Sequence, residues 1–181
     1  MATPDFILEL RRHIGTAPLW LTGVTAVVLR EVPAADHDDD ADDDDDDDAD
    51  DAPAVRRQVL LVRRADNGAW TPVTGIVDPG EEPAVAAARE VLEEAAILAL
   101  PQRLASVSVT EEVVYPNGDR TQYLDLTFRF AHVSGDPHPA DGESSQARWF
   151  DLDALPPLSE RMAARISAAL PERGEALFVA P

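Results

Sequence analysis

Three glutamates lie within five residues of one predicted helix, at positions 90, 93 and 94. Residues three or four apart share one face of a helix, so Glu90 lies beside both Glu93 and Glu94. Carboxylates this close repel one another and raise one another's pKa, and a divalent cation reverses that penalty. Magnesium takes oxygen ligands, often one or two carboxylates with water and substrate phosphates. This face therefore has the residue types for metal-assisted attack of water on a phosphorus atom.

An acidic helix face is most often only a solvated surface, so the neighbouring residues must distinguish the two interpretations. Arg89 can reach Glu93 one turn further along the helix, or brace Glu90 beside it. Upstream, Gly75 and Glu81 flank a segment rich in glycine and proline, which indicates a tightly defined backbone. A merely solvated face has no reason to carry this upstream pattern, and we therefore favour a functional site.

The stretch from Gly75 to Ile97, GIVDPGEEPAVAAAREVLEEAAI, resembles the Nudix box, G-x5-E-x7-R-E-U-x-E-E-x-G-U, in which U is a bulky aliphatic residue. One position departs, because Ala96 stands where the family has glycine. Glycine is favoured just past a helix end, where the chain often enters the left-handed region. We therefore expect Ala96 to be strained, with a positive φ; the alternative is a helix that continues to Leu100 and stops before Pro101.

The resemblance implies a fold and an activity. The fold is an α/β, Nudix-type α/β/α sandwich with a central mixed β-sheet. The activity is that of a Mg2+-dependent pyrophosphohydrolase, an enzyme that cleaves a nucleoside diphosphate linked to another group. The resemblance further implies that Glu90, Glu94, Glu93 and the carbonyl of Gly75 hold Mg2+, with Mn2+ as a possible substitute. Glu90 is the first candidate for the base, with Arg89 and Glu93 as further catalytic residues.

Two further sets of residues complete the expected site. Nudix enzymes commonly add an acid from a loop between the later strands, and the loop at 137–146 offers Asp141 and Glu143. We favour Glu143, which has the longer stem, as a second metal ligand or as the base in place of Glu90. Arg63 and Tyr123, together with Gly75, are the candidates for contact with the substrate.

The sequence leaves the substrate open. A nucleoside triphosphate, in particular an oxidised one such as 8-oxo-dGTP, is the first choice. ADP-ribose, a dinucleotide or a nucleotide sugar is the alternative. The alternative that is not an enzyme is a Nudix domain that binds a nucleotide and acts as a regulator. Such a binding domain need not keep all three glutamates, so their presence favours the enzyme.

Composition restricts the class of protein. The 181 residues suit one domain, 1–181, and the absence of cysteine excludes disulfides and thiol chemistry. No lysine is present, which excludes a Walker lysine. Thirteen aspartates between positions 36 and 51 account for most of the net charge of −20, and we expect this tract to be a disordered insertion.

Charge and hydropathy also bear on partners. We expect a small-molecule nucleotide substrate and no duplex nucleic acid, because no basic stripe is visible. No apolar run is long enough to span a membrane and the N-terminus lacks the pattern of a signal peptide, so a cytoplasmic protein without a membrane partner is expected. A homodimer is one possible assembly.

The elements expected to position these residues follow from hydrophobic periodicity and turn signals. Helices are predicted at 4–14, from Pro83 through the box, and at 157–170. Strands are predicted at 19–29, 55–62, 104–115, 121–133 and 147–150, with a tight turn at 116–119. The continuous apolar run at 59–62 is typical of a strand that is buried on both faces.

Overall fold

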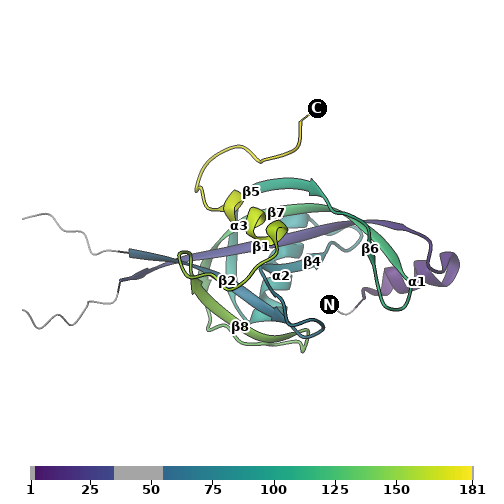
Figure 1. The fold of residues 1–181 in the computed structure, drawn as a ribbon, viewed down its shortest axis with the longest axis horizontal. Helices are drawn as coiled ribbons and strands as arrows, with labels where there is room; N and C mark the ends of the chain where they lie inside the picture. Colours follow the sequence, from purple (N-terminus) through teal and green to yellow (C-terminus); the bar gives the residue numbers. More distant parts are fainter. Residues whose placement is uncertain (1–2, 35–54, 181) are drawn as a thin grey trace, which may run out of the picture.

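The computed structural model describes residues 3–34 and 55–180 (Figure 1). The aspartate-rich insertion predicted at 36–51 lies outside these residues. The described elements, in chain order, are α1 (Asp5–Ile14), β1 (Leu19–Pro33), β2 (Val55–Arg64), β3 (Trp70–Thr71), β4 (Val73–Ile76), α2 (Pro83–Ala95), β5 (Leu98–Val109), β6 (Val113–Val114), β7 (Arg120–Ser134), β8 (Ser144–Asp151) and α3 (Glu160–Ala169).

The strands form one sheet, with the order β3-β2-β1-β7-β5. β4 also pairs with β1, β6 with β7, and β8 with β2. The two longest strands, β1 and β7, run parallel, whereas the other paired strands are antiparallel. The sheet is therefore mixed, as expected.

Two apolar layers cover the two faces of this sheet. In β2, Leu60 and Val62 point into the layer that also contains the buried residues of α2. Val59 and Leu61 point the opposite way, into the layer completed by α3. All four side chains are at most 1% exposed. The predicted α/β/α sandwich is confirmed, and Figure 1 shows its central sheet together with α2 and α3.

The end of α2 shows how the chain returns to the sheet. Ala96 adopts φ 55° and ψ 30°, and its backbone N–H donates to the carbonyl of Leu92. The predicted left-handed conformation at Ala96 is thus confirmed. Because the helix stops there, β5 begins at Leu98, six residues earlier than the strand expected at 104–115. That strand also ends earlier, at Val109, and only 113–114 resume pairing as β6.

Other predicted boundaries need smaller corrections. β1 extends to Pro33, because it keeps pairing with β2 beyond Leu29. β8 begins at Ser144 because it follows the edge of β2 down to Arg64. α3 begins at Glu160, where Ser159 caps the helix by accepting a hydrogen bond from the backbone of Met162.

The C-terminal end of α3 is capped from other elements. The helix has no basic residue in its last turn. Instead Arg129 of β7 donates to the carbonyls of Ala169 and Leu170, and Arg103 of β5 donates to that of Ala168. These charged donors satisfy carbonyls that lack helical partners and lie at the negative end of the helix dipole. They tie α3 to its face of the sheet. Across the described ranges, no helix is long and apolar enough to cross a membrane.

Candidate active site

The box helix α2 presents its carboxylates along the flank of its buried face. Pro83 occupies the first turn, where its missing N–H costs nothing. The residues that pack on the sheet form an apolar stripe of Ala86, Ala87, Val91 and Ala95. Glu90 and Glu94 flank this stripe and are only 8% and 6% exposed, whereas Glu93 is exposed. Two glutamates are therefore buried side by side, one helical turn apart.

Arg89 organises three of the acids in the box. Its Nε and one terminal nitrogen each donate at 3.0 Å to the two carboxylate oxygens of Glu81. Its other terminal nitrogen donates to Oε1 of Glu90 at 3.0 Å and to Oε2 of Glu93 at 3.1 Å. The hydrogen bonds from Arg89 lower the pKa of Glu81, which therefore stays ionised. A planar guanidinium suits this arrangement because its donors lie in a rigid fork.

Gly75 leaves the space that Glu90 occupies. Gly75 lies in β4, where it pairs with Val24 of β1. A Cβ at this position would lie 2.2 Å from Cγ and 2.5 Å from Oε1 of Glu90. The requirement for glycine is thus a requirement for close approach of backbone and carboxylate, which periodicity alone does not explain.

Burial makes the two inner carboxylates hold protons more tightly. Loss of solvent raises the pKa of Glu94 to about 7, and the nearby charges of Glu90 and Asp141 act in the same direction. Burial likewise raises the pKa of Glu90, although Arg89 opposes the shift. Glu94 accepts a hydrogen bond from the hydroxyl of Ser144, at 3.4 Å. A cation placed between these carboxylates would favour their ionised forms and so offset the free-energy cost of burying two negative charges.

A cavity of about 430 Å³ opens beside Arg89 and Glu90. The start of α1 and residues 76–79 each supply both apolar and acidic lining residues. α2 and the loop before β8 supply charged ones. The lining residues are Pro4, Asp5, Phe6, Ile76, Asp78, Pro79, Arg89, Glu90, Glu93, Asp141 and Glu143. A volume of this size lies within the range of small-molecule sites.

The loop before β8 brings both predicted acids to this cavity. Asp141 accepts a hydrogen bond from the backbone N–H of Glu143 at 2.9 Å. The carbonyl of Glu143 in turn accepts one from the backbone N–H of Ala65, which follows β2. Glu143 is half-buried and Asp141 is exposed. Both line the cavity, and their catalytic roles stay predictions.

None of the three predicted substrate contacts, Gly75, Arg63 and Tyr123, lines this cavity. Arg63 donates to the carbonyl of Gly68 at 3.0 Å and so braces the turn after β2. The hydroxyl of Tyr123 lies 2.7 Å from that of Tyr115, and its ring packs against a small apolar cluster at the end of the sheet. Contact of either side chain with a substrate stays a prediction.

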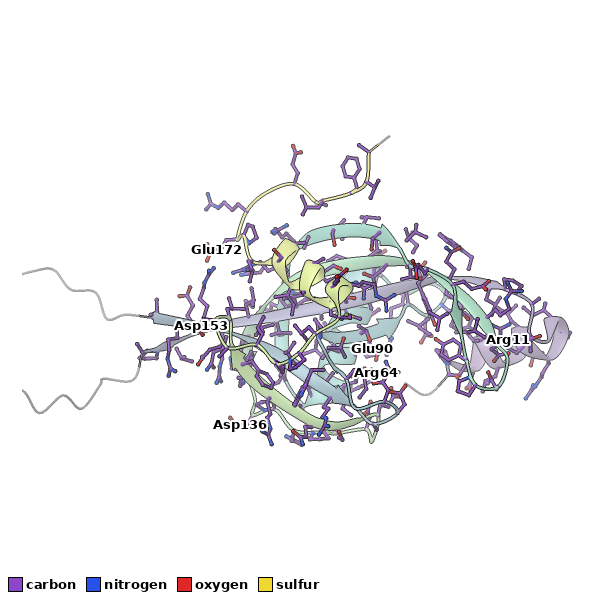
Figure 2. All side chains as sticks on the ribbon, in the orientation of Figure 1. Arg11, Arg64, Glu90, Asp136, Asp153 and Glu172 are labelled. Atoms are coloured by element: carbon purple, nitrogen blue, oxygen red, sulfur yellow. The ribbon has the colours of Figure 1, made fainter. Side chains whose placement is uncertain are left out.

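Arg64, which was not among the predicted site residues, does not line the cavity but interacts electrostatically with Glu94. Its guanidinium pairs with Asp66. These hydrogen bonds raise the pKa of Arg64, and the charge of Glu94 adds to the effect. In Figure 2, Arg64 and Glu90 lie in the same region of the molecule. Strand alternation could have identified it, because Leu60, Val62 and Arg64 have the same parity and the first two face α2.

The residues present fit a divalent cation. Carboxylate oxygens are the donors that Mg2+ prefers, and Gly75 adds a backbone carbonyl in β4 beside Glu90. Over residues 3–34 and 55–180, no three His, Asp or Glu side chains are grouped so that they alone could hold a metal ion. Three protein side chains are not required, because Mg2+ commonly keeps several waters, is bound through one or two carboxylates and takes further ligands from substrate phosphates.

Comparison with known proteins agrees with this geometry. The family model of the NUDIX domain matches residues 48–171. The NAD-capped RNA hydrolase NudC of Pseudomonas aeruginosa (strain LESB58) is 35% identical over 111 residues, which are 60% of this chain and 37% of the relative. A MutT-like protein of Streptomyces ambofaciens is 35% identical over 106 residues, or 59% of this chain and 61% of the relative. The chain thus spans little more than a third of the NudC protein that it matches.

Solved structures show the same fold. A UDP-X diphosphatase superimposes with a TM-score of 0.56 at 19% identity, covering 93% of this chain and 70% of the other. An ADP-ribose pyrophosphatase from Streptococcus suis gives a TM-score of 0.54 at 20% identity, with 86% and 96% covered. The box residues, the sandwich around α2 and the match over residues 48–171 place this chain in the Nudix family.

Proposed function

We propose that this protein is a divalent-cation-dependent pyrophosphohydrolase that acts on a dinucleotide-type substrate, a nucleoside diphosphate joined to a second nucleoside. The observation that carries the proposal is the arrangement around Arg89, which holds Glu81, Glu90 and Glu93 beside a cavity. A solvated acidic helix would not bury Glu90 and Glu94.

The choice among substrates rests on the relatives. Several curated relatives at 32–35% identity are described as NAD-capped RNA hydrolases. A NAD cap contains two nucleosides joined through a pyrophosphate, which is the dinucleotide alternative that the sequence left open beside a nucleoside triphosphate. The lining is also too acidic to receive a pyrophosphate without cations, since Arg89 is its one basic residue against six acids among the described residues.

The roles of the residues follow from their positions. Glu90, Glu94, Glu93 and the carbonyl of Gly75 would hold Mg2+, or Mn2+ in its place. When bound, the cation polarises phosphoryl oxygens and lowers the pKa of water. Glu90 accepts the proton of the attacking water, because burial raises the pKa of its carboxyl group and so strengthens it as a proton acceptor. Arg89 keeps the carboxylate of Glu90 in place.

A hydrolysis screen tests the proposal. NAD, ADP-ribose, a nucleotide sugar and 8-oxo-dGTP are offered with Mg2+, with Mn2+ or with EDTA, and products are separated by chromatography. We expect NAD to yield two mononucleotides with either metal and none with EDTA. Turnover of no substrate, together with tight binding of one, would instead identify a nucleotide-binding domain.

Arg64 is expected to bind a substrate phosphate. Its guanidinium lies near Glu94 and can exchange Asp66 for a phosphate oxygen pair. Arg64→Ala should raise KM by roughly tenfold or more with a smaller change in kcat, because a hydrogen bond to a charged group contributes about 1.5–3 kcal/mol. Arg63→Ala is the comparison variant, because this neighbour braces a turn and its contact with the substrate is the rival prediction. Equal effects of the two substitutions would contradict the assignment.

Glu143 is expected to take part in the chemical step. It lines the cavity together with residues of α2 and is less exposed than Asp141 on the same loop. Glu143→Gln should therefore lower kcat much more than Asp141→Asn does, with KM little changed in both. Steady-state kinetics on the substrate identified by the screen provide the comparison. Small and equal effects would leave the loop without a catalytic role.

A further inference from the structure

The cavity beside the carboxylates also has apolar lining residues, which the chemistry of phosphate transfer does not use. Its apolar lining residues are Pro4, Phe6, Ile76 and Pro79. Two of these come from the start of α1, more than 80 positions before Glu90 in the sequence. Phe6 is the one aromatic residue of the lining, within the described part of the chain.

The position of α1 is fixed by two anchors. Ile7, next to Phe6, is 5% exposed and packs in a cluster with Leu21 and Ile76. Four residues further along, Arg11 donates to the carbonyl of Arg120 at 2.8 Å and to the hydroxyl of Thr121 at 3.2 Å. Figure 1 shows α1 at one end of the sheet beside β6 and β7. The first turn of α1 is therefore held against the domain, and its contribution to the cavity is built into the fold.

The side chain of Phe6 contacts both an apolar cluster and the cavity. It packs against the cluster of Ile7, Leu21 and Ile76, yet it remains half-buried and lines the cavity. Ile76 is shared in the same way, and its carbonyl accepts a hydrogen bond from Arg89 at 3.4 Å. Ile76 therefore links Phe6 to Arg89, the arginine that holds the carboxylates.

We infer that Phe6 forms a stacking surface for the nucleobase of the substrate, so that α1 is one wall of the nucleoside subsite. A pyrophosphate placed at the acids of α2 leaves its attached nucleoside to extend into the cavity, where Phe6 is the aromatic lining residue. Every nucleobase has a π-face, and stacking on an aromatic side chain is tolerant of base identity. The ligand class, a nucleoside joined to a pyrophosphate, rests on the proposed function.

Binding of product halves tests the inference without turnover. Calorimetric titrations with AMP, nicotinamide mononucleotide and ribose 5-phosphate, all in Mg2+, are made on the wild type, Phe6→Leu and Phe6→Tyr. Leucine keeps apolar volume against Ile7 but removes the π-face, whereas tyrosine keeps it. Leu8→Ala is the matched control, because Leu8 is 47% exposed on the same helix and does not line the cavity.

The expected result is a loss of about tenfold in the affinity of Phe6→Leu for at least one of the two nucleotides. Affinity for ribose 5-phosphate should not change, and Phe6→Tyr and Leu8→Ala should match the wild type. Equal losses for nucleotides and ribose 5-phosphate, no loss at all, or no nucleotide binding by the wild type would each overturn the inference.

The two proposals fail separately. Hydrolysis of NAD by a Phe6→Leu protein with unchanged nucleotide affinity would keep the proposed function and remove the stacking role. Phe6-dependent nucleotide binding without hydrolysis of any substrate would keep the stacking role and remove the proposed function. Melting temperatures of the four proteins identify a purely structural role, in which Phe6→Leu lowers stability but leaves every affinity unchanged.

Discussion

Replacing Glu94 with glutamine is expected to abolish most of the turnover in Mg2+ while making the metal-free protein more stable. The loss of kcat should be at least about a hundredfold, because a bound cation contributes several kcal/mol to stabilising charge in the transition state. Glutamine preserves the shape of the side chain and can still accept a hydrogen bond from Ser144. Packing around position 94 is therefore kept while a charged oxygen ligand is lost.

The gain in stability follows from the burial of the charge. Glu94 is 6% exposed, and burial raises its pKa from 4.5 to about 7. A carboxyl whose folded pKa is raised favours the folded state fully below pH 4.5, and this contribution is lost as the pH rises through about 7. At pH 8 without metal the wild type carries the cost of the ionised group, on the order of 2–3 kcal/mol. Glutamine at position 94 avoids that cost.

Chemical denaturation in EDTA at several pH values measures this effect. The free energy of unfolding of Glu94→Gln should increasingly exceed that of the wild type as the pH rises from 4.5 to about 7. Above that pH the difference should stay constant. Glu93→Gln is the control for stability, because Glu93 is exposed and its pair with Arg89 is worth at most about 1 kcal/mol. Added Mg2+ should stabilise only the wild type and so make it more stable than Glu94→Gln. A Glu94→Gln protein with normal kcat, or one less stable at pH 8, would contradict the assignment.

The local part of the site could be predicted from the sequence, because helical spacing alone determines it. Glu90, Glu93 and Glu94 fall on one side of α2 wherever that helix lies, and Arg89 reaches Glu93 at i,i+4. The strain at Ala96 could be predicted for a similar reason, since a helix end favours the left-handed region. The continuous apolar run in β2 likewise indicated burial on both faces.

The remaining parts of the site depend on tertiary packing, which periodicity does not encode. The burial of Glu90 and Glu94 arises because α2 lies against β4 and the start of β8. The interaction of Arg64 with Glu94 was not predicted, because it depends on which face of β2 is covered by α2. The contribution of α1 to the cavity joins segments far apart in the chain. The boundaries of β5 were misjudged because the tight turn at Ala96 allows pairing with β7 to start at once.

Gly75→Ala is expected to be the most damaging substitution of a residue that carries no functional side chain. The new Cβ would lie 2.2 Å from Cγ and 2.4 Å from Cδ of Glu90, far inside van der Waals contact. Gly75 is buried and paired with Val24, so the backbone has little freedom to yield. Glu90 must therefore move away from Arg89 and from the carbonyl of Gly75.

Both stability and activity should respond to Gly75→Ala. Overpacking of this kind costs about 1–3 kcal/mol in the free energy of unfolding. Displacing a catalytic group by about 1 Å can lower the rate roughly a hundredfold, and we expect a loss of kcat of that order. Thr74→Ala is the matched control, because Thr74 is the preceding residue of β4 and its side chain points to the opposite face. It should leave kcat within about a factor of two to three.

A second substitution separates steric displacement of Glu90 from a general disturbance of β4. In Gly75→Ala/Glu90→Asp the shorter acid leaves room for the added methyl group, so denaturation should show that most of the lost stability returns. Turnover should stay low, because aspartate at position 90 cannot place its carboxylate where Arg89 holds that of Glu90. The coupling between the two positions should be positive and exceed 0.5 kcal/mol, as expected for residues in contact. Additive losses of stability, or a single Gly75→Ala variant with near-normal kcat, would show that the contact between Gly75 and Glu90 does not set the position of the carboxylate proposed to be catalytic.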